Sequence, residues 1–240
     1  MIKFFRKIRQ NLLMENKTGK YFKYAIGEIV LVVIGILIAL GINDWNEKRK
    51  NREHGNMIKQ ALKAELINDL VLIKVDLKYT ETELEINLGY AKRLSDVNAN
   101  LDTLTKIVRN EYYIGFNGIS ELDKTTFKSL ESTGTLNLIG NDLAKNTQKY
   151  YIGREFNIGV INNNNKIYYN LMEPFMLKYP ANYFAINGHL REEYWENVDS
   201  NQLSGMFNGL LTSRLFNLGV RKRILKETID KTQKLINQFD

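Results

Sequence analysis

The longest run of apolar residues in the chain lies close to its start. Residues 29–42 read IVLVVIGILIALGI, fourteen positions without a polar side chain, of which eleven are Ile, Leu or Val. Extended to residues 24–43, the stretch would form about 30 Å of helix, which matches the hydrocarbon core of a bilayer. Insertion of its aliphatic side chains outweighs the cost of its single acid, Glu28. The pattern therefore predicts a transmembrane helix over residues 24–43.

Aromatic residues flank this stretch on both sides. Tyr21 and Tyr24 lie at one edge and Trp45 at the other, where they would serve as interface anchors. A buried core helix is one alternative, although such a helix usually carries a polar stripe. A cleaved signal peptide is another, because Ala39-Leu40-Gly41 is a small-x-small triplet. That leader would be longer than the usual 15 to 30 residues and would contain an acid.

From Asn46 onward, apolar residues recur every three or four positions, which is the period of a helix. The recurrence continues without proline to about residue 98, so we expect one long helix that continues straight out of the apolar stretch. Arg49, Lys50 and Arg52 would line a solvated face of it. The expected buried seam consists of Leu66, Leu70, Ile73, Leu77, Thr80, Leu84, Leu88, Ala91 and Leu94.

The sequence after residue 98 predicts short and long helices in alternation. A short helix is expected over residues 101–113, and a turn over 115–118. Ser120 with Asp123 resembles a capping box, which would start a third helix near Glu121 and end it at residues 132–134. Asn141 is a good N-cap for a fourth helix, which Pro180 would close.

The fourth helix should bury four tyrosines at helical spacing and should be solvated or kinked at residues 162–165, a run of asparagines. After a connection with a short helical turn at residues 191–195, Asp199 or Ser200 would open the last helix. Its seam consists of Phe207, Leu211, Leu215, Leu218, Leu225, Ile229, Thr232, Ile236 and Phe239.

No segment alternates as a half-buried strand would, so the predicted fold class is all-α. A transmembrane helix continues into an elongated helical bundle, in which the first and last helices pack together because their seams match. The expected organisation is a basic tail (1–23), a transmembrane helix (24–43), a long stalk and bundle helix (44–98) and the rest of the bundle (99–240).

The charge distribution favours a membrane over nucleic acid as the partner. The formal charge is +7, and residues 1–23 contribute +6 of it, with seven basic residues against one acid. Such a tail is attracted to anionic lipid, and residues 2–13 form either an interfacial amphipathic helix or an irregular basic segment. Equal numbers of Lys and Arg flank the apolar stretch, so their count does not set the orientation. The N-terminal tail is almost purely basic, whereas the flank after the stretch also contains Asp44, Glu47 and Glu53. We expect the tail inside and the body outside the cytoplasm.

Two segments resemble a known family. The first is YAIGEI at residues 24–29, followed by LVVIGILIALGIN and Asp44-Trp45-Asn46-Glu47, and the second is SLESTGTLNLI at residues 129–139. Both resemble an uncharacterised family of single-pass membrane proteins of flavobacteria and relatives, which has a domain of unknown function. The resemblance implies a bacterial inner-membrane protein with a helical soluble body. It implies no activity and no catalytic residues.

The candidate site residues lie within the apolar stretch. An ionisable residue inside a membrane, here Glu28, indicates function by default. Gly27, Gly35 and Ala39 would let a second helix approach closely, and Gly35 and Ala39 form a small-xxx-small pair. These four residues predict association with a second copy or with another membrane protein. The alternative is that Glu28 reaches the inner interface and has no further role.

Composition removes several classes of chemistry. The chain has no cysteine and two histidines, so thiolate sites and multi-histidine metal centres are excluded. Glu192 and Glu193, near His189, are interpreted as polar surface beside a Trp195 anchor. No catalytic, cofactor-binding or metal-binding residue is assigned. The leading hypothesis is a non-enzymatic interaction, sensing or scaffold module. The alternatives are an envelope hydrolase that uses two carboxylates and an accessory subunit of a transporter or channel.

Overall fold

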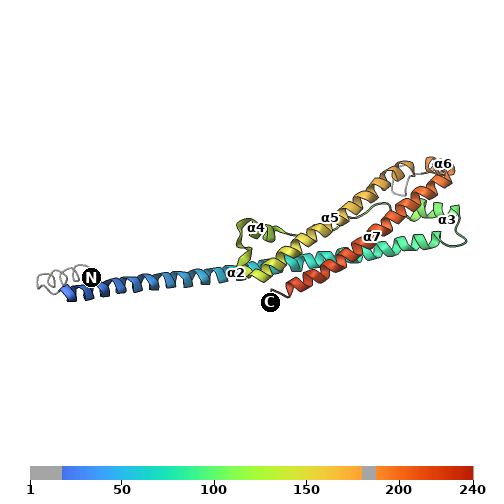
Figure 1. Ribbon diagram of the computed structural model, residues 1–240. Helices are drawn as coiled ribbons and strands as arrows, with labels where there is room; N and C mark the ends of the chain where they lie inside the picture. The colour runs from blue at the N-terminus through green and yellow to red at the C-terminus, as the bar shows by residue number, and fades with distance from the viewer. Residues whose placement is uncertain (1–17, 180–187, 240) are drawn as a thin grey trace. The chain divides into compact units, whose positions relative to one another are not determined.

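The computed structural model describes residues 18–179 and 188–239 (Figure 1). Of these residues, 86% are helical and none forms a strand, which confirms the all-α prediction. The chain divides into two compact units, Met1–Met57 and Ile58–Asp240, which are described separately below. The expectations for Pro180 and for residues 2–13 lie outside the described residues.

The longest element is helix α2, Thr18–Leu94. It includes both the apolar stretch and the residues with helical period that follow it, so the prediction of one uninterrupted helix is confirmed. In the first unit, Arg49, Lys50 and Arg52 are all exposed, as expected, and Arg49 pairs with Glu53 at 3.2 Å, one turn later.

The second unit continues from α2 into a short helix and an extended segment. Helix α3 (Leu101–Lys106) begins at the N-cap Asn100, whose side chain accepts a hydrogen bond from the Thr103 amide. It passes into a π-helical turn, η1 (Ile107–Glu111), in which the Tyr112 amide bonds the Ile107 carbonyl at 2.8 Å. Expecting one regular helix over 101–113 was therefore wrong in its second half. The wider turn brings Tyr112 into the core, where it is buried.

Helix α4 (Thr125–Thr133) starts four residues later than predicted. The expected capping box does not form, because Ser120 and Asp123 bond acids of α2 through their backbone amides instead of each other. The predicted end is correct: Gly134 caps α4 with φ +68°, a left-handed conformation that glycine adopts without strain. A short 3-10 turn, η2 (Thr135–Ile139), follows.

Two long antiparallel helices form the rest of the second unit (Figure 1). Helix α5 (Asn141–Lys178) starts one residue earlier than predicted, because Gly140 and not Asn141 is its N-cap. Helix α6 (His189–Glu196) is the short turn expected near residue 191. Helix α7 (Ser200–Ile236) begins after Asp199, whose side chain accepts two backbone amides.

Helices α5 and α7 lie closest together, and α2 and α7 also pack together, as their matching seams predicted, because both contribute to one apolar cluster. Helix α2 reaches α7 through long side chains, because Glu81 contacts both Lys222 and Lys226 at 3.1 Å, and Glu83 contacts Arg214 at 2.5 Å. Charged side chains of this length keep two helix backbones further apart than interlocking leucines do.

Two apolar clusters make up the core of the second unit. One joins the start of its α2 segment (Ile58–Leu70) to α4, the start of α5 and the end of α7. The other joins α3 and η1 to the end of α5, α6 and the start of α7. Residues 90–94 of α2 pack against this second cluster. Between the two parts of α2 that contact the clusters lie three buried polar residues: Asp76, Thr80 and Asn87.

The predicted seam of α2 is mostly correct, and Leu88 is its exposed member. Leu66, Leu70 and Ile73 are buried as expected, whereas Leu77 is half-buried. Further on, Leu88 is 51% exposed and its neighbour Asn87 is 2% exposed. Thr80 is buried as expected, and Ala91 and Leu94 are partly buried against the second apolar cluster, so the seam still faces the core beyond Leu88.

Two local expectations for α5 also need correction. Tyr150, Tyr151 and Tyr168 are buried, but Tyr169 is partly exposed and donates to the Phe116 carbonyl. The asparagine run is not uniformly solvated, because Asn165 is buried and its amide oxygen accepts from the Asn217 side chain at 2.9 Å.

Candidate functional site

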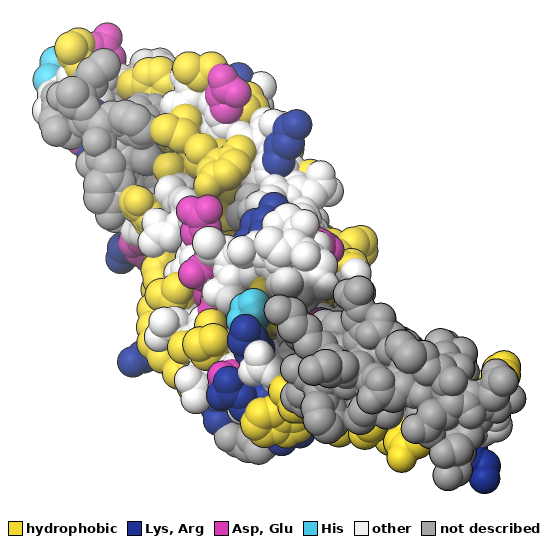
Figure 2. All heavy atoms as spheres, turned by 90° about the vertical axis from the view of Figure 1, so that its left-hand side faces the viewer, with side chains coloured by type: hydrophobic (Ala, Val, Ile, Leu, Met, Phe, Trp, Pro, Cys, Tyr) yellow, Lys and Arg dark blue, Asp and Glu magenta, His cyan; other side chains and the backbone are white. Residues whose placement is uncertain are grey.

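The apolar part of α2 is exposed along its whole described length. Every large apolar side chain from Phe22 to Ile42, and Trp45 beyond it, is about half exposed or more. Among the described residues, α2 is the one helix long and apolar enough to cross a membrane, as judged by length and composition. This apolar surface of α2 would be an aggregation hazard in water, and in a bilayer it would match its solvent. Figure 2 shows, by contrast, that hydrophobic and charged side chains are intermixed over the visible surface of the molecule.

Helical geometry sorts the four candidate association residues. At about 100° per residue, Glu28, Gly35 and Ala39 fall within about 40° of arc and share one face. Gly27 points about 100° away from Glu28 and so lies off this face. Glu28 is half-buried, and Ala39 is exposed. The sequence grouped four residues, whereas the helix places three of them on one line.

The two candidate glycines, Gly35 on this face and Gly27 off it, have no neighbours that require a glycine. A Cβ atom built at Gly27 or Gly35 would meet no other atom within 4 Å. Their small size is therefore not needed for packing within the described part of the chain. Of the predicted anchors, Tyr24 and Trp45 are exposed, and the Tyr21 side chain lies outside the described ones.

The second unit holds a buried charged network around residues 112–124, the extended segment between η1 and α4. This segment has no regular secondary structure, so its backbone groups need partners from elsewhere. Its carbonyl and amide groups bond side chains of three long helices, and the contacts fall in antiparallel order along α2. The α2 residues in that order are Asp76, Asp69 and Glu65, and Glu83 joins the network through Arg214.

Carboxylates of α2 accept the amide protons of this segment and of the start of α4. Asp76 accepts the Ser120 amide at 2.8 Å and the Ser120 hydroxyl at 3.0 Å. Asp69 accepts the Asp123 amide at 2.9 Å, and Glu65 accepts an amide at the start of α4 at 2.9 Å. These carboxylates therefore act as caps supplied from a different helix.

Arginines of α5 and α7 donate to the carbonyl groups of the same segment. Arg214 donates to the Gly115 carbonyl at 2.7 Å, and Arg221 donates to the Asn117 and Gly118 carbonyls at 2.7 and 2.9 Å. The guanidinium of Arg214 also lies 5.1 Å from the centroid of the Phe116 ring. Both arginines are 1% exposed, so hydrogen bonds and rings replace their hydration.

A buried ion pair links the carboxylates of α2 to the arginines that bind the carbonyl groups of the segment. Arg154 on α5 pairs with Asp69 on α2 and also donates to the Asp123 carbonyl at 2.6 Å. Asp69 and Arg154 are 1% and 3% exposed. Burial raises the pKa of Asp69, although the Asp123 amide and Arg154 oppose that rise. Burial likewise lowers the pKa of Arg221.

Sequence reasoning missed this network. Glu65, Asp69, Asp76 and Glu83 recur at intervals of four or seven residues on α2, a signal that is visible in the sequence. Acids at that spacing normally indicate a solvated helix face, and nothing local distinguishes a buried row from an exposed one. Their arginine partners lie 85 and 131 residues further along the chain.

The remaining candidate residues form surface contacts. Glu192 pairs with Arg109, which lowers the pKa of Glu192. Trp195 is buried and anchors α6, as expected. Within residues 18–179 and 188–239, no group of three or more His, Cys, Asp or Glu side chains is placed to hold a metal ion.

Comparison with known families finds one match. A family of unknown function (DUF6090) matches residues 28–118, which agrees with the resemblance to an uncharacterised family. The matched region begins at Glu28 and ends within the extended segment, so it covers most of α2 together with α3 and η1. The second family-like run, residues 129–139, lies outside it. Comparison with curated proteins and with solved structures finds no match.

Proposed function

We propose that this chain is a single-pass, membrane-anchored helical module that works by binding other proteins and not by catalysis. The exposed apolar surface of α2 carries the proposal, because no packing partner within the described chain explains it. In this proposal the protein lies in the inner membrane of a bacterium, with its N-terminus in the cytoplasm and residues 46–240 in the periplasm. Lipid and a protein partner are the expected ligands, and no cofactor is required.

Association within the membrane is the specific form of this proposal. The face of Glu28, Gly35 and Ala39 supports it, since a small-residue face lets two helices approach closely and a carboxyl group can bond across the interface. The partner is a second copy of the chain or another membrane protein. Direct interhelical bonds of this kind are worth about 1 to 2 kcal/mol in model peptides.

Topology is tested first. A reporter fused after Asp240 should be active only outside the cytoplasm, and the full-length chain should stay in the membrane pellet at alkaline pH. Cytoplasmic activity of the reporter would reverse the proposed orientation. A soluble form that begins near Ile42 would identify the apolar stretch as a cleaved signal peptide.

Association is tested by cross-linking in bilayers of the wild type and three variants. Gly35→Leu should reduce association by separating the backbones, and Glu28→Gln should reduce it by removing the charge. Gly41→Leu is the matched control, because Gly41 lies in the same stretch, about 120° from Gly35 around the helix, and also has no neighbour within 4 Å. Purely monomeric behaviour of all four proteins, with no co-purified membrane protein, would refute the association.

A further inference from the structure

A groove of about 280 Å³ lies between the first half of α5 and the end of α7. Its floor contains the Tyr150 ring and Leu235, and its surface is mainly carbon. The Tyr150 hydroxyl is already bonded to the Thr232 hydroxyl at 2.7 Å, so the ring edge and face are what the floor offers. A bond of 2.9 Å between Asn146 and Gln238 joins the two helices beside it. All these residues belong to the second unit.

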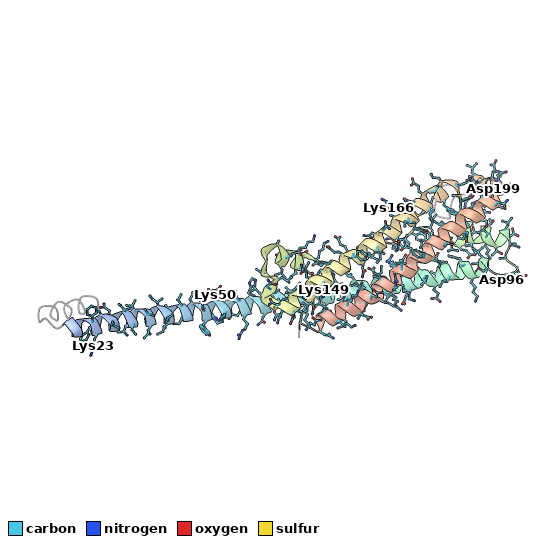
Figure 3. All side chains as sticks on the ribbon, in the orientation of Figure 1. Lys23, Lys50, Asp96, Lys149, Lys166 and Asp199 are labelled. Carbon is cyan, nitrogen blue, oxygen red and sulfur yellow. The ribbon has the colours of Figure 1, made fainter. Side chains whose placement is uncertain are left out.

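The charged side chains that line this groove are all basic. Lys149 comes from α5, and Lys231 and Lys234 come from α7 (Figure 3 labels Lys149). Arg154 also lines it, but its charge is matched by Asp69 behind the floor. Lys231 has a loose contact with Glu227 at 3.9 Å. The three lysines therefore give the groove a net positive field over an apolar surface.

Gly153 keeps the groove open. It lies within α5 with ordinary helical backbone angles, and a Cβ atom there would meet nothing within 4 Å. Most other residues favour a helix more than glycine does, so its presence is not required by the backbone. A larger side chain at this position would occupy the groove without displacing any protein atom near its Cβ.

We propose that this groove binds a small organic anion with an aromatic or compact apolar body, such as an aryl carboxylate. The apolar body lies on the Tyr150 ring and Leu235, and the carboxylate faces Lys149 and Lys234. The volume is just below the range of about 300 to 1,000 Å³ for small-molecule sites, which limits the ligand to about one ring and its substituents. The inference does not depend on the membrane anchor, so the two proposals can fail separately.

The test uses the full chain in lipid nanodiscs and ¹⁹F NMR, with empty nanodiscs as the blank. The probe is 4-(trifluoromethyl)benzoate, and its amide is the neutral probe of the same shape. We expect saturable binding of the benzoate with a dissociation constant of about 1 mM, the weak end for a ligand of this size. The amide should bind at least about fivefold more weakly, because it cannot use the lysines.

Two variants and two matched controls locate the site. Gly153→Leu should abolish binding of the benzoate, and Lys149→Gln with Lys234→Gln should weaken it about fivefold or more. Gly159→Leu and Lys166→Gln change an equally open glycine and an exposed lysine of α5 outside the groove, and should leave binding within about twofold. Figure 3 shows Lys166 further along α5 than Lys149.

Circular dichroism verifies that each variant remains helical. If Gly153→Leu does not fold, the double variant Lys149→Gln with Lys234→Gln still tests the groove, because it changes exposed side chains only. The proposal is refuted by the absence of saturable benzoate binding up to about 10 mM. It is also refuted if the amide binds as well as the benzoate, or if the groove variants bind no more weakly than their controls.

Discussion

Replacing Asp69 with Asn should destabilise the second unit by removing the counter-charge of Arg154. In the wild type, one oxygen of Asp69 accepts the Asp123 amide at 2.9 Å, and the other pairs with Arg154. Asn keeps the first acceptor but turns an NH₂ group toward the guanidinium. The charge of Arg154, which is 3% exposed, then has no counter-charge at that position.

The magnitude follows from burial. Removing one partner of a buried ion pair lowers the free energy of unfolding by about 3 to 5 kcal/mol, because the other charge stays buried. Since burial raises the pKa of Asp69, the carboxylate itself pays a desolvation penalty that Asn avoids. We therefore expect the lower part of that range, about 3 kcal/mol.

A double replacement separates the ion pair from its role as a cap. Substituting Leu for Asp69 together with Met for Arg154 removes both charges, which for a simple ion pair is often neutral. Here the amide and carbonyl of Asp123 would both lose their partners, at about 1 to 3 kcal/mol for each buried group. The double variant should therefore also be destabilised, by at least about 2 kcal/mol.

The assay is chemical denaturation of the full chain in detergent micelles, followed by circular dichroism. Glu155→Gln is the control, because Glu155 forms an exposed pair with Lys124 close to the same segment, and its loss should change stability by less than about 1 kcal/mol. If Asp69→Asn changes stability no more than this control does, the network does not hold the segment.

Three further predictions use the same unfolding measurement. Leu225→Ala should lower stability by about 2 to 5 kcal/mol because Leu225 is 4% exposed, and Leu77→Ala should cost less because Leu77 is half-buried; equal losses would contradict this. Gly134→Ala should cost about 1 kcal/mol, since its φ of +68° strains any residue with a Cβ, and an unchanged stability would rule out that strain. Arg93 lowers the pKa of Glu111 below its ordinary 4.5, so the unfolded chain takes up this proton first as the pH falls. The contribution of Glu111 is therefore complete above about pH 4.5 and lost below it, and Glu111→Gln should flatten the profile there.

The sequence alone determined the fold class and some of the helix ends. A run of fourteen apolar residues and an unbroken three-four period are local properties, and they predicted a helix to about residue 98, close to the observed end of α2 at Leu94. Gly134 and Asp199 marked a helix end and a helix start because their preference for those positions is also local. The exposed face of Glu28 and Gly35 could be placed from spacing alone, since a single helix fixes it.

Only the tertiary structure decided which polar residues are buried and what they bind. Ser120 and Asp123 have the spacing of a capping box, yet their amides bond Asp76 and Asp69. Asn87 is buried although its neighbour Leu88 is 51% exposed. The partners of Ser120 and Asp123 lie in another helix. A sequence pattern reports the preferences of neighbouring residues, whereas the burial of a charge depends on whether a distant segment supplies its counter-charge and hydrogen bonds.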